Sequence, residues 1–177
     1  MKKMTGADLV NNIINTEKPQ EILDLKCRKW YFSLLASSYG AHVEVVDDPK
    51  NPEFPDFLKF HPNITYNCSE VAEFEIKKKY DMIIVKHIAI SYEREFFLGT
   101  LMPEVHNHLT SWGIAFVTFH FPDSYVMKCH PEYFQYSIDD FRDLKENFIL
   151  KDFGEYHKEV PYTVEFEHIG YVVLQKR

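Results

Sequence analysis

The chain has 177 residues, of which 45% are hydrophobic and 16% aromatic, and its formal net charge at pH 7 is −7. This length fits one domain over residues 1–177 with a ring-rich core, and the acidic balance excludes non-specific binding to nucleic acid, which needs a basic face. Residues 1–6 form no apolar leader and no apolar run of about 18 residues occurs, so we expect a cytoplasmic protein without a membrane segment. Three widely spaced cysteines without a Cys-x-x-Cys pair give no sign of a disulfide framework or structural zinc.

Taken in chain order, the sequence predicts helices and strands in alternation. Thr5 and Asp8 have the spacing of a capping box before an apolar helical stripe. The further elements that we expect are a strand at Glu21–Leu25, a helix at about 29–38, strands at 41–46, 64–66 and Tyr80–Val85, a helix at 93–109 that Pro103 kinks or splits, a strand at 114–119, a helix at 137–145, and strands at 148–156 and 164–174.

The order of elements near the start is typical of a nucleotide-type cofactor site in a parallel sheet: strand, tight loop, helix, then a strand that ends at Asp47. Within it, the stretch from Ile22 to Ala36 resembles the first motif of the class I S-adenosylmethionine-dependent methyltransferases, roughly (V/I)-L-D-L-G-C-G-x-G-x-x-x-x-x-L-A. Asp24 and Cys27 match this motif, and the Leu-Ala end matches one residue early.

The three glycines of that motif are replaced by Lys26, Arg28 and Trp30. Glycine in such a loop permits a positive φ or lets the backbone approach a ligand closely. Larger side chains should close this space, and the cations repel S-adenosylmethionine, whose net charge is positive. Two interpretations of the cations stay open. Their long side chains point to water, or Lys26 and Arg28 bind an anionic ligand such as a phosphate or nucleotide beside a helix N-terminus.

Within the methyltransferases, the chain resembles most closely the small tellurite-resistance enzymes, over about residues 21–177. The segments that carry this resemblance are Gly40-Ala-His-Val43 with Asp47, Tyr80-Asp-Met-Ile83, Tyr92-Glu-Arg-Glu95 and Gly154-Glu-Tyr-His157-Lys158. The resemblance implies an α/β, three-layer Rossmann-like methyltransferase fold, in which an antiparallel C-terminal hairpin closes a mostly parallel sheet.

The resemblance also implies where a cofactor would bind. Asp24 would hold the amino group of S-adenosylmethionine or cap the loop, and Asp47 would accept hydrogen bonds from the ribose hydroxyls. Ser69 and Glu70 follow the third predicted strand, in a loop whose counterpart contacts the adenine. Together with the altered loop, the implied cofactor-binding residues are Asp24, Lys26, Arg28, Trp30, Asp47, Ser69 and Glu70.

The C-terminal motif of the family suggests the catalytic residues. In relatives a histidine and the arginine after it are thought to act on the substrate, and these positions correspond to His157 and Lys158. Lysine lacks the planar guanidinium group with which arginine binds an oxyanion through two hydrogen bonds, so an oxyanion such as tellurite would be bound less tightly.

The histidines predict no metal site. His106 and His108 are two residues apart and do not share a helical face. His87, His120 and His130 lie at or after strand ends and could line the cleft, but their spacing is not that of metal ligands.

Two functions from different classes stay open. The first is an S-adenosylmethionine-dependent methyltransferase of the tellurite-resistance type, weak or inactive because of its altered loop. The second is a non-catalytic binding or interaction module on the same fold, with a small-molecule ligand or a protein partner.

The altered loop predicts that the wild-type protein does not bind S-adenosylmethionine tightly. If the glycine conformations persisted, each substituted residue in a left-handed conformation would cost about 1–2 kcal/mol, and each 1.4 kcal/mol lost is about tenfold in affinity. Isothermal titration of wild type beside the triple variant Lys26→Gly, Arg28→Gly, Trp30→Gly checks this, with folding confirmed for both. Low-micromolar binding by the wild type would show the prediction wrong.

Overall fold

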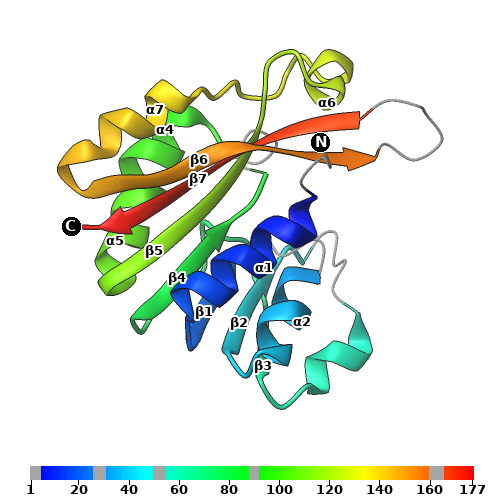
Figure 1. Ribbon diagram of the computed structural model, residues 1–177, viewed down its shortest axis with the longest axis vertical. Coiled ribbons are helices and arrows are strands. Elements are labelled where there is room, and N and C mark those ends of the chain that lie inside the picture. Colours follow the sequence, from blue (N-terminus) through cyan, green and yellow to red (C-terminus); the bar gives the residue numbers. More distant parts are fainter. Residues whose placement is uncertain (1–4, 26–30, 50–54, 88–91, 160–165) are drawn as a thin grey trace.

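The computed structural model describes residues 5–25, 31–49, 55–87, 92–159 and 166–177, and Figure 1 shows their arrangement. The helical elements are α1 (Gly6–Glu17), α2 (Tyr31–Ser38), η1 (Asp56–Phe60), α4 (Arg94–Phe96), η2 (Phe97–Leu101), α5 (Met102–His108), α6 (Tyr125–Cys129), α7 (Ile138–Arg142) and η3 (Asp143–Glu146). The strands are β1 (Glu21–Leu25), β2 (His42–Asp47), β3 (Ile64–Cys68), β4 (Tyr80–Val85), β5 (Leu109–His120), β6 (Phe148–Glu159) and β7 (Phe166–Lys176).

The described strands form one seven-stranded sheet in the order β3-β2-β1-β4-β5-β7-β6. Strands β1 to β5 pair in parallel, whereas β7 runs antiparallel to both β5 and β6. The predicted fold class is therefore confirmed, including the C-terminal hairpin with β6 at one edge. In the centre of the sheet, Asp24 of β1 is the register partner of Val45 in β2 and of Ile84 in β4. The strand order reverses between β1 and β4, which makes this pair the topological switch point.

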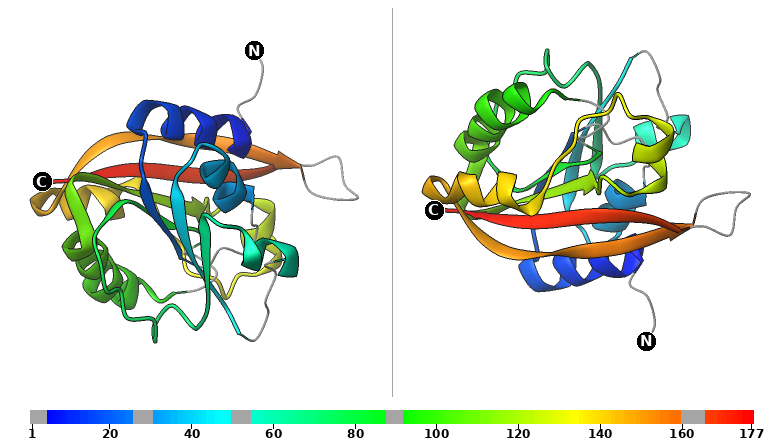
Figure 2. Two further views of the ribbon diagram at one scale, coloured as in Figure 1. Left: turned by 90° about the horizontal axis from the view of Figure 1, so that it is seen from below. Right: turned by 90° about the horizontal axis from the view of Figure 1, so that it is seen from above.

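Helices cover both faces of the sheet, so the protein has three layers (Figure 2). On one face, α1 and α2 pack against an apolar cluster that includes Ile22, Val45 and Phe116. On the other face, η2, α5, α6 and α7 contribute to a second cluster around the remaining strand residues. Because β1 and β4 are buried from both sides, their apolar runs are nearly continuous, as is usual in parallel sheets.

The ends of the helices follow from local sequence. Thr5 Oγ1 accepts the amide hydrogen of Asp8 at 3.2 Å, and Asp8 accepts that of Thr5 at 3.1 Å, so the predicted capping box is present. A second box joins Ser137 and Asp140 before α7. Pro103 lies in the first turn of α5, where its missing N–H costs least. The helix predicted at 93–109 is thus divided into α4 and α5 by the π turn η2 that lies between them.

Polar side chains tie the strands together at the amino-terminal edge of the sheet. Asp81 accepts the amide hydrogens of Gln20 at 3.0 Å and Glu21 at 3.1 Å, and the hydroxyl of Thr110 at 3.2 Å. The neighbouring Tyr80 hydroxyl donates to Glu44 at 2.5 Å. The Tyr-Asp pair thus anchors β4 to β1, β2 and β5, leaving the opposite edge for ligands.

The sequence did not predict the short helical elements η1 and α6, and two strands depart from their expected form. Strand β5 begins at Leu109 and not at Ile114, because residues 110–113 continue the strand as an irregular stretch in which the register against β4 shifts. Trp112 has a φ of 71° there and is 76% exposed. The other difference concerns edge strand β6, where Lys151 bulges between Leu150 and Asp152 and its ammonium contacts Glu17 of α1 at 2.7 Å.

None of the helices in the described part of the chain is long and apolar enough to cross a membrane.

The contact between Gly170 of β7 and Phe119 of β5 yields a stability prediction. A Cβ at Gly170 would lie 2.5 Å from Cζ of Phe119, and this ring is held by Phe121 and Phe141 in the core. We expect Gly170→Ala to lower the free energy of unfolding by about 1–3 kcal/mol, as overpacking does, when measured by urea denaturation.

The matched control is Gly99→Ala. Gly99 lies on the exposed side of η2 with no atom within 4 Å of its added Cβ, so the stability should stay level or rise by up to about 1 kcal/mol. Equal stability of Gly170→Ala and wild type would contradict the packing described.

Candidate functional site

A buried ion pair joins the carboxyl ends of β1 and β4. Lys86, the residue after β4, donates from Nζ to Oδ2 of Asp24 at 2.9 Å. Asp24 is 0% exposed and Lys86 is 3% exposed. Ligands of open α/β sheets bind outside the carboxyl ends of the strands at the switch point. The pair therefore spans the crevice in which a ligand is expected.

Helix α2 completes the surroundings of the Lys86 ammonium. Ser33 donates its hydroxyl to the same Asp24 oxygen at 2.8 Å, and Lys86 Nζ lies 4.8 Å from the ring centroid of Phe32. Oδ1 of Asp24 has no hydrogen-bond partner among the described residues. A carboxylate beside an aromatic face is a receptor for ammonium groups, and here the chain's own lysine occupies it.

A pair of histidines lies at the ends of β4 and β5. Nδ1 of His87 and Nε2 of His120 are 3.1 Å apart, and their rings stack with centroids 5.3 Å apart. The amide of His87 donates to the Thr118 hydroxyl at 3.0 Å, which fixes a left-handed backbone with φ of 53°. Since one ring nitrogen must accept the shared hydrogen, both rings cannot be charged while this contact persists. Nearby on β6, burial raises the pKa of Tyr156, so its hydroxyl stays protonated.

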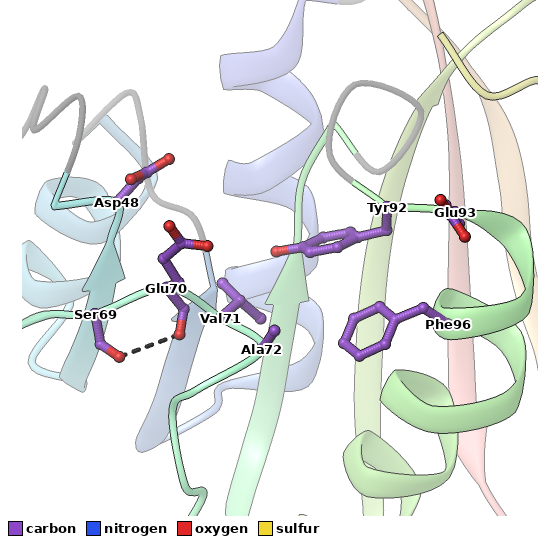
Figure 3. A pocket seen from close by; sticks show the side chains of 8 residues that line it. All are labelled: Asp48, Ser69, Glu70, Val71, Ala72, Tyr92, Glu93 and Phe96. Atoms are coloured by element: carbon purple, nitrogen blue, oxygen red, sulfur yellow. Dashed lines mark hydrogen bonds between the residues drawn. The ribbon is translucent and has the colours of Figure 1, made fainter.

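An acidic, ring-lined cavity of about 300 Å³ lies beyond the ends of β2 and β3. Its lining residues are Asp48, Ser69, Glu70, Val71, Ala72, Tyr92, Glu93 and Phe96. In Figure 3 the carboxylates of Asp48 and Glu70 lie on one side, and the rings of Tyr92 and Phe96 on the other. The two rings are 5.6 Å apart between centroids. Carboxylates can accept hydrogen bonds from hydroxyls, and the rings offer apolar faces to a flat ligand.

Asp47 lies beneath this cavity and does not line it. Its side chain is fully buried, and its carbonyl oxygen accepts the amide hydrogen of Ser69 at 3.0 Å. Burial, a hydrogen bond with Cys68 and the charge of Asp47 raise the pKa of Tyr66 to about 12, so the phenol beside Asp47 keeps its proton. Asp47 thus supports the turn that presents Asp48 and Ser69, and its contact with ribose stays a prediction.

The structure brings some of the sequence-predicted site residues together. Ser69 and Glu70 lie in one cavity, and Asp24 lies at the switch point. Lys26, Arg28 and Trp30 lie outside the described residues. The backbone of His157 is in β6, level with His168 of β7. The side chains of His157 and Lys158 lie outside the described part, so their catalytic role also stays a prediction.

The sequence patterns did not predict four residues of the site: Lys86, Asp48, Tyr92 and Phe96. A charged residue directly after the buried run Tyr80–Val85 was the available signal for Lys86. Among the described residues, no three His, Cys, Asp or Glu side chains gather so that they could hold a metal ion. His130 lies apart from the histidine pair, against Glu132 and Tyr133.

Comparison with known proteins shows a likeness of structure. The sequence matches no protein-family model and no curated protein. The structure is similar to N-methyltransferase NodS from Bradyrhizobium japonicum WM9 in complex with S-adenosyl-L-homocysteine, with a TM-score of 0.73 and 10% identity, covering 97% of this chain and 88% of that one. TehB from Haemophilus influenzae has a TM-score of 0.73 and 16% identity, covering 95% of this chain and 61% of that one.

A third similar structure is magnesium protoporphyrin IX methyltransferase (ChlM) from Synechocystis PCC 6803 with bound S-adenosylmethionine. Its TM-score is 0.72 at 14% identity, and the match covers 97% of this chain and 79% of that one. These likenesses show that the chain has the fold of the class I S-adenosylmethionine-dependent methyltransferases.

S-adenosylmethionine, which this fold implies, fits the described residues only in part. The cavity with Asp48, Glu70, Tyr92 and Phe96 offers acceptors and ring faces that suit an adenosine group. Asp24, however, is the carboxylate that we expect to hold the amino group, and it is already paired with Lys86. The amino group of the cofactor would therefore have to share the Asp24 carboxylate with the buried Lys86 ammonium.

Proposed function

We propose that this protein is a non-catalytic member of the methyltransferase fold that binds an adenosine-type nucleoside without transferring a methyl group. The observation that carries the proposal is the cavity beyond β2 and β3, with carboxylates on one side and aromatic rings on the other. An acid at the end of the second strand is the usual partner of ribose hydroxyls in such sheets. Here Asp48 is the acid that lines the cavity, with Glu70 beside it.

The aromatic side of the cavity suits a nucleobase. Tyr92 is held in place because its carbonyl oxygen accepts the hydroxyl of buried Tyr136 at 3.0 Å. Phe96, which is half-buried, packs beside it and presents its ring to the cavity. Stacking on such rings contributes about 1–3 kcal/mol per base. The cavity therefore combines a positioned ring with acceptors for sugar hydroxyls.

Two features speak against methyl transfer. The cations and bulk at Lys26, Arg28 and Trp30 replace the glycines of a cofactor loop, and Lys86 occupies the carboxylate of Asp24. Both place positive charge where a cationic cofactor would bind. Lys86 is not among the residues that line the nucleoside cavity, so binding and catalysis can be lost separately.

Titration with adenosine and 2′-deoxyadenosine tests nucleoside binding. We expect wild type to bind adenosine, and Asp48→Asn to weaken binding about tenfold, since the charged acceptor for a ribose hydroxyl is lost. 2′-Deoxyadenosine should bind wild type about tenfold more weakly than adenosine. Asp123→Asn, an exposed acid outside the cavity, is the matched control and should bind as wild type. Failure of wild type to bind adenosine would contradict the proposal.

A second candidate is a working methyltransferase of the tellurite-resistance type. It is supported by the likeness to TehB and by the position of His157. Because β6 runs in the same direction as β5, this residue near the end of β6 lies toward the edge at which the parallel strands end.

Methyl transfer from S-adenosylmethionine to tellurite tests this candidate. If the enzyme is active, His157→Ala should lower the rate at least 100-fold, as expected for loss of an acid–base residue, while the exposed His130→Ala keeps it. No transfer by wild type, or full activity of His157→Ala, would eliminate His157 as a catalytic residue.

A further inference from the structure

We infer that Lys86 fills, from within the chain, the place of a ligand's ammonium group, so that the site selects adenosine nucleosides that lack an amino-acid group. This inference rests on the proposed nucleoside binding and names the class of ligand. It is carried by the buried pair of Lys86 and Asp24, whose two partners come from the two strands that flank the switch point.

Three described residues around the Lys86 ammonium form a receptor for a positive charge. The carboxylate of Asp24 lies 2.9 Å away, and the Phe32 ring centroid lies 4.8 Å away. Ser33 orients the carboxylate through its hydroxyl. All four residues have at most 9% of their surface exposed. An incoming ammonium at Oδ1 of Asp24 would lie beside the buried Lys86 ammonium on the same carboxylate, and the two like charges would repel each other.

The position of the pair decides which ligands fit. Asp24 is one residue from the end of β1, and Lys86 directly follows β4. The nucleoside cavity opens beyond the same carboxyl edge, at β2 and β3. A ligand that extends from the cavity along this edge toward the switch point meets the carboxylate of Asp24 with the ammonium of Lys86 already bound to it. An ammonium on its 5′ substituent is repelled there, whereas a small uncharged substituent is not.

The chemical class selected is therefore an adenosine with a short neutral 5′ group. 5′-Methylthioadenosine has this structure, and S-adenosylhomocysteine adds to it an ammonium and a carboxylate. The two compounds share the adenosine group and the thioether, so their comparison isolates the amino-acid part.

The experiment titrates wild type and Lys86→Met with 5′-methylthioadenosine and with S-adenosylhomocysteine. Wild type should bind the first at least tenfold more tightly than the second. In Lys86→Met the carboxylate of Asp24 is released, so affinity for S-adenosylhomocysteine should rise at least tenfold while that for 5′-methylthioadenosine stays within threefold. Lys145→Met, which removes an exposed lysine from η3, is the matched control and should leave both affinities unchanged.

Two further variants keep the result decisive if Lys86→Met does not fold. Lys86→Gln keeps a hydrogen-bond donor toward Asp24 without the charge and should show a smaller gain in the same direction. The double variant Asp24→Asn, Lys86→Met removes both charges, and it should bind 5′-methylthioadenosine without gaining affinity for S-adenosylhomocysteine.

The outcomes separate this inference from the proposed function. Equal affinity of wild type for both compounds, or no gain of S-adenosylhomocysteine binding by folded Lys86→Met or Lys86→Gln, overturns the role of Lys86 while nucleoside binding stands. If no variant binds 5′-methylthioadenosine, the nucleoside function itself fails, and the inference fails with it.

Discussion

The carboxylate of Asp24 is buried in the central strand of a parallel sheet, and the surrounding structure must compensate its charge. An isolated buried carboxylate costs several kcal/mol, and removing one partner of a buried ion pair typically costs about 3–5 kcal/mol. Lys86 supplies the opposite charge, Ser33 a hydrogen bond and Phe32 a ring face. The relative positions of β1, β4 and α2 at this edge are thus constrained by one charge.

This constraint divides the carboxyl edge of the sheet into two regions of different chemistry. At the switch point the charges of Asp24 and Lys86 oppose each other within the protein, and only Oδ1 of Asp24 has no hydrogen-bond partner in this pair's described surroundings. At the ends of β2 and β3, the carboxylates of Asp48 and Glu70 face a cavity together with two rings. The anchoring contacts of Asp81 and Tyr80 lie at the opposite edge, so the ligand-binding edge can change while the frame persists.

Much of the frame could be predicted from the sequence, because mostly apolar stretches of five and six residues define β1 and β4, and the caps at Thr5 and Ser137 start their helices. The site was less predictable, since it depends on which way successive residues point. Both faces of β2 are covered at its end, so Val46 and Asp47 are both buried and Asp48, directly after the strand, lines the cavity. In α2 the buried face contains Phe32 and Ser33, although Leu34 and Leu35 are more apolar than Ser33. Asp24 and Lys86 are 62 residues apart, and only the register of β1 against β4 brings them together.

The bulge at Lys151 shapes the outer edge of the sheet. β6 is twelve residues long and lies at an edge, and a long regular edge strand can pair with a strand from another chain. The extra residue twists the strand locally and interrupts its row of backbone donors and acceptors. Lys151 and Asp152 place charges at the same point, and the contact of Lys151 with Glu17 holds the bulge against α1. The strand that closes the sheet is therefore shaped so that the sheet does not continue into a neighbouring molecule.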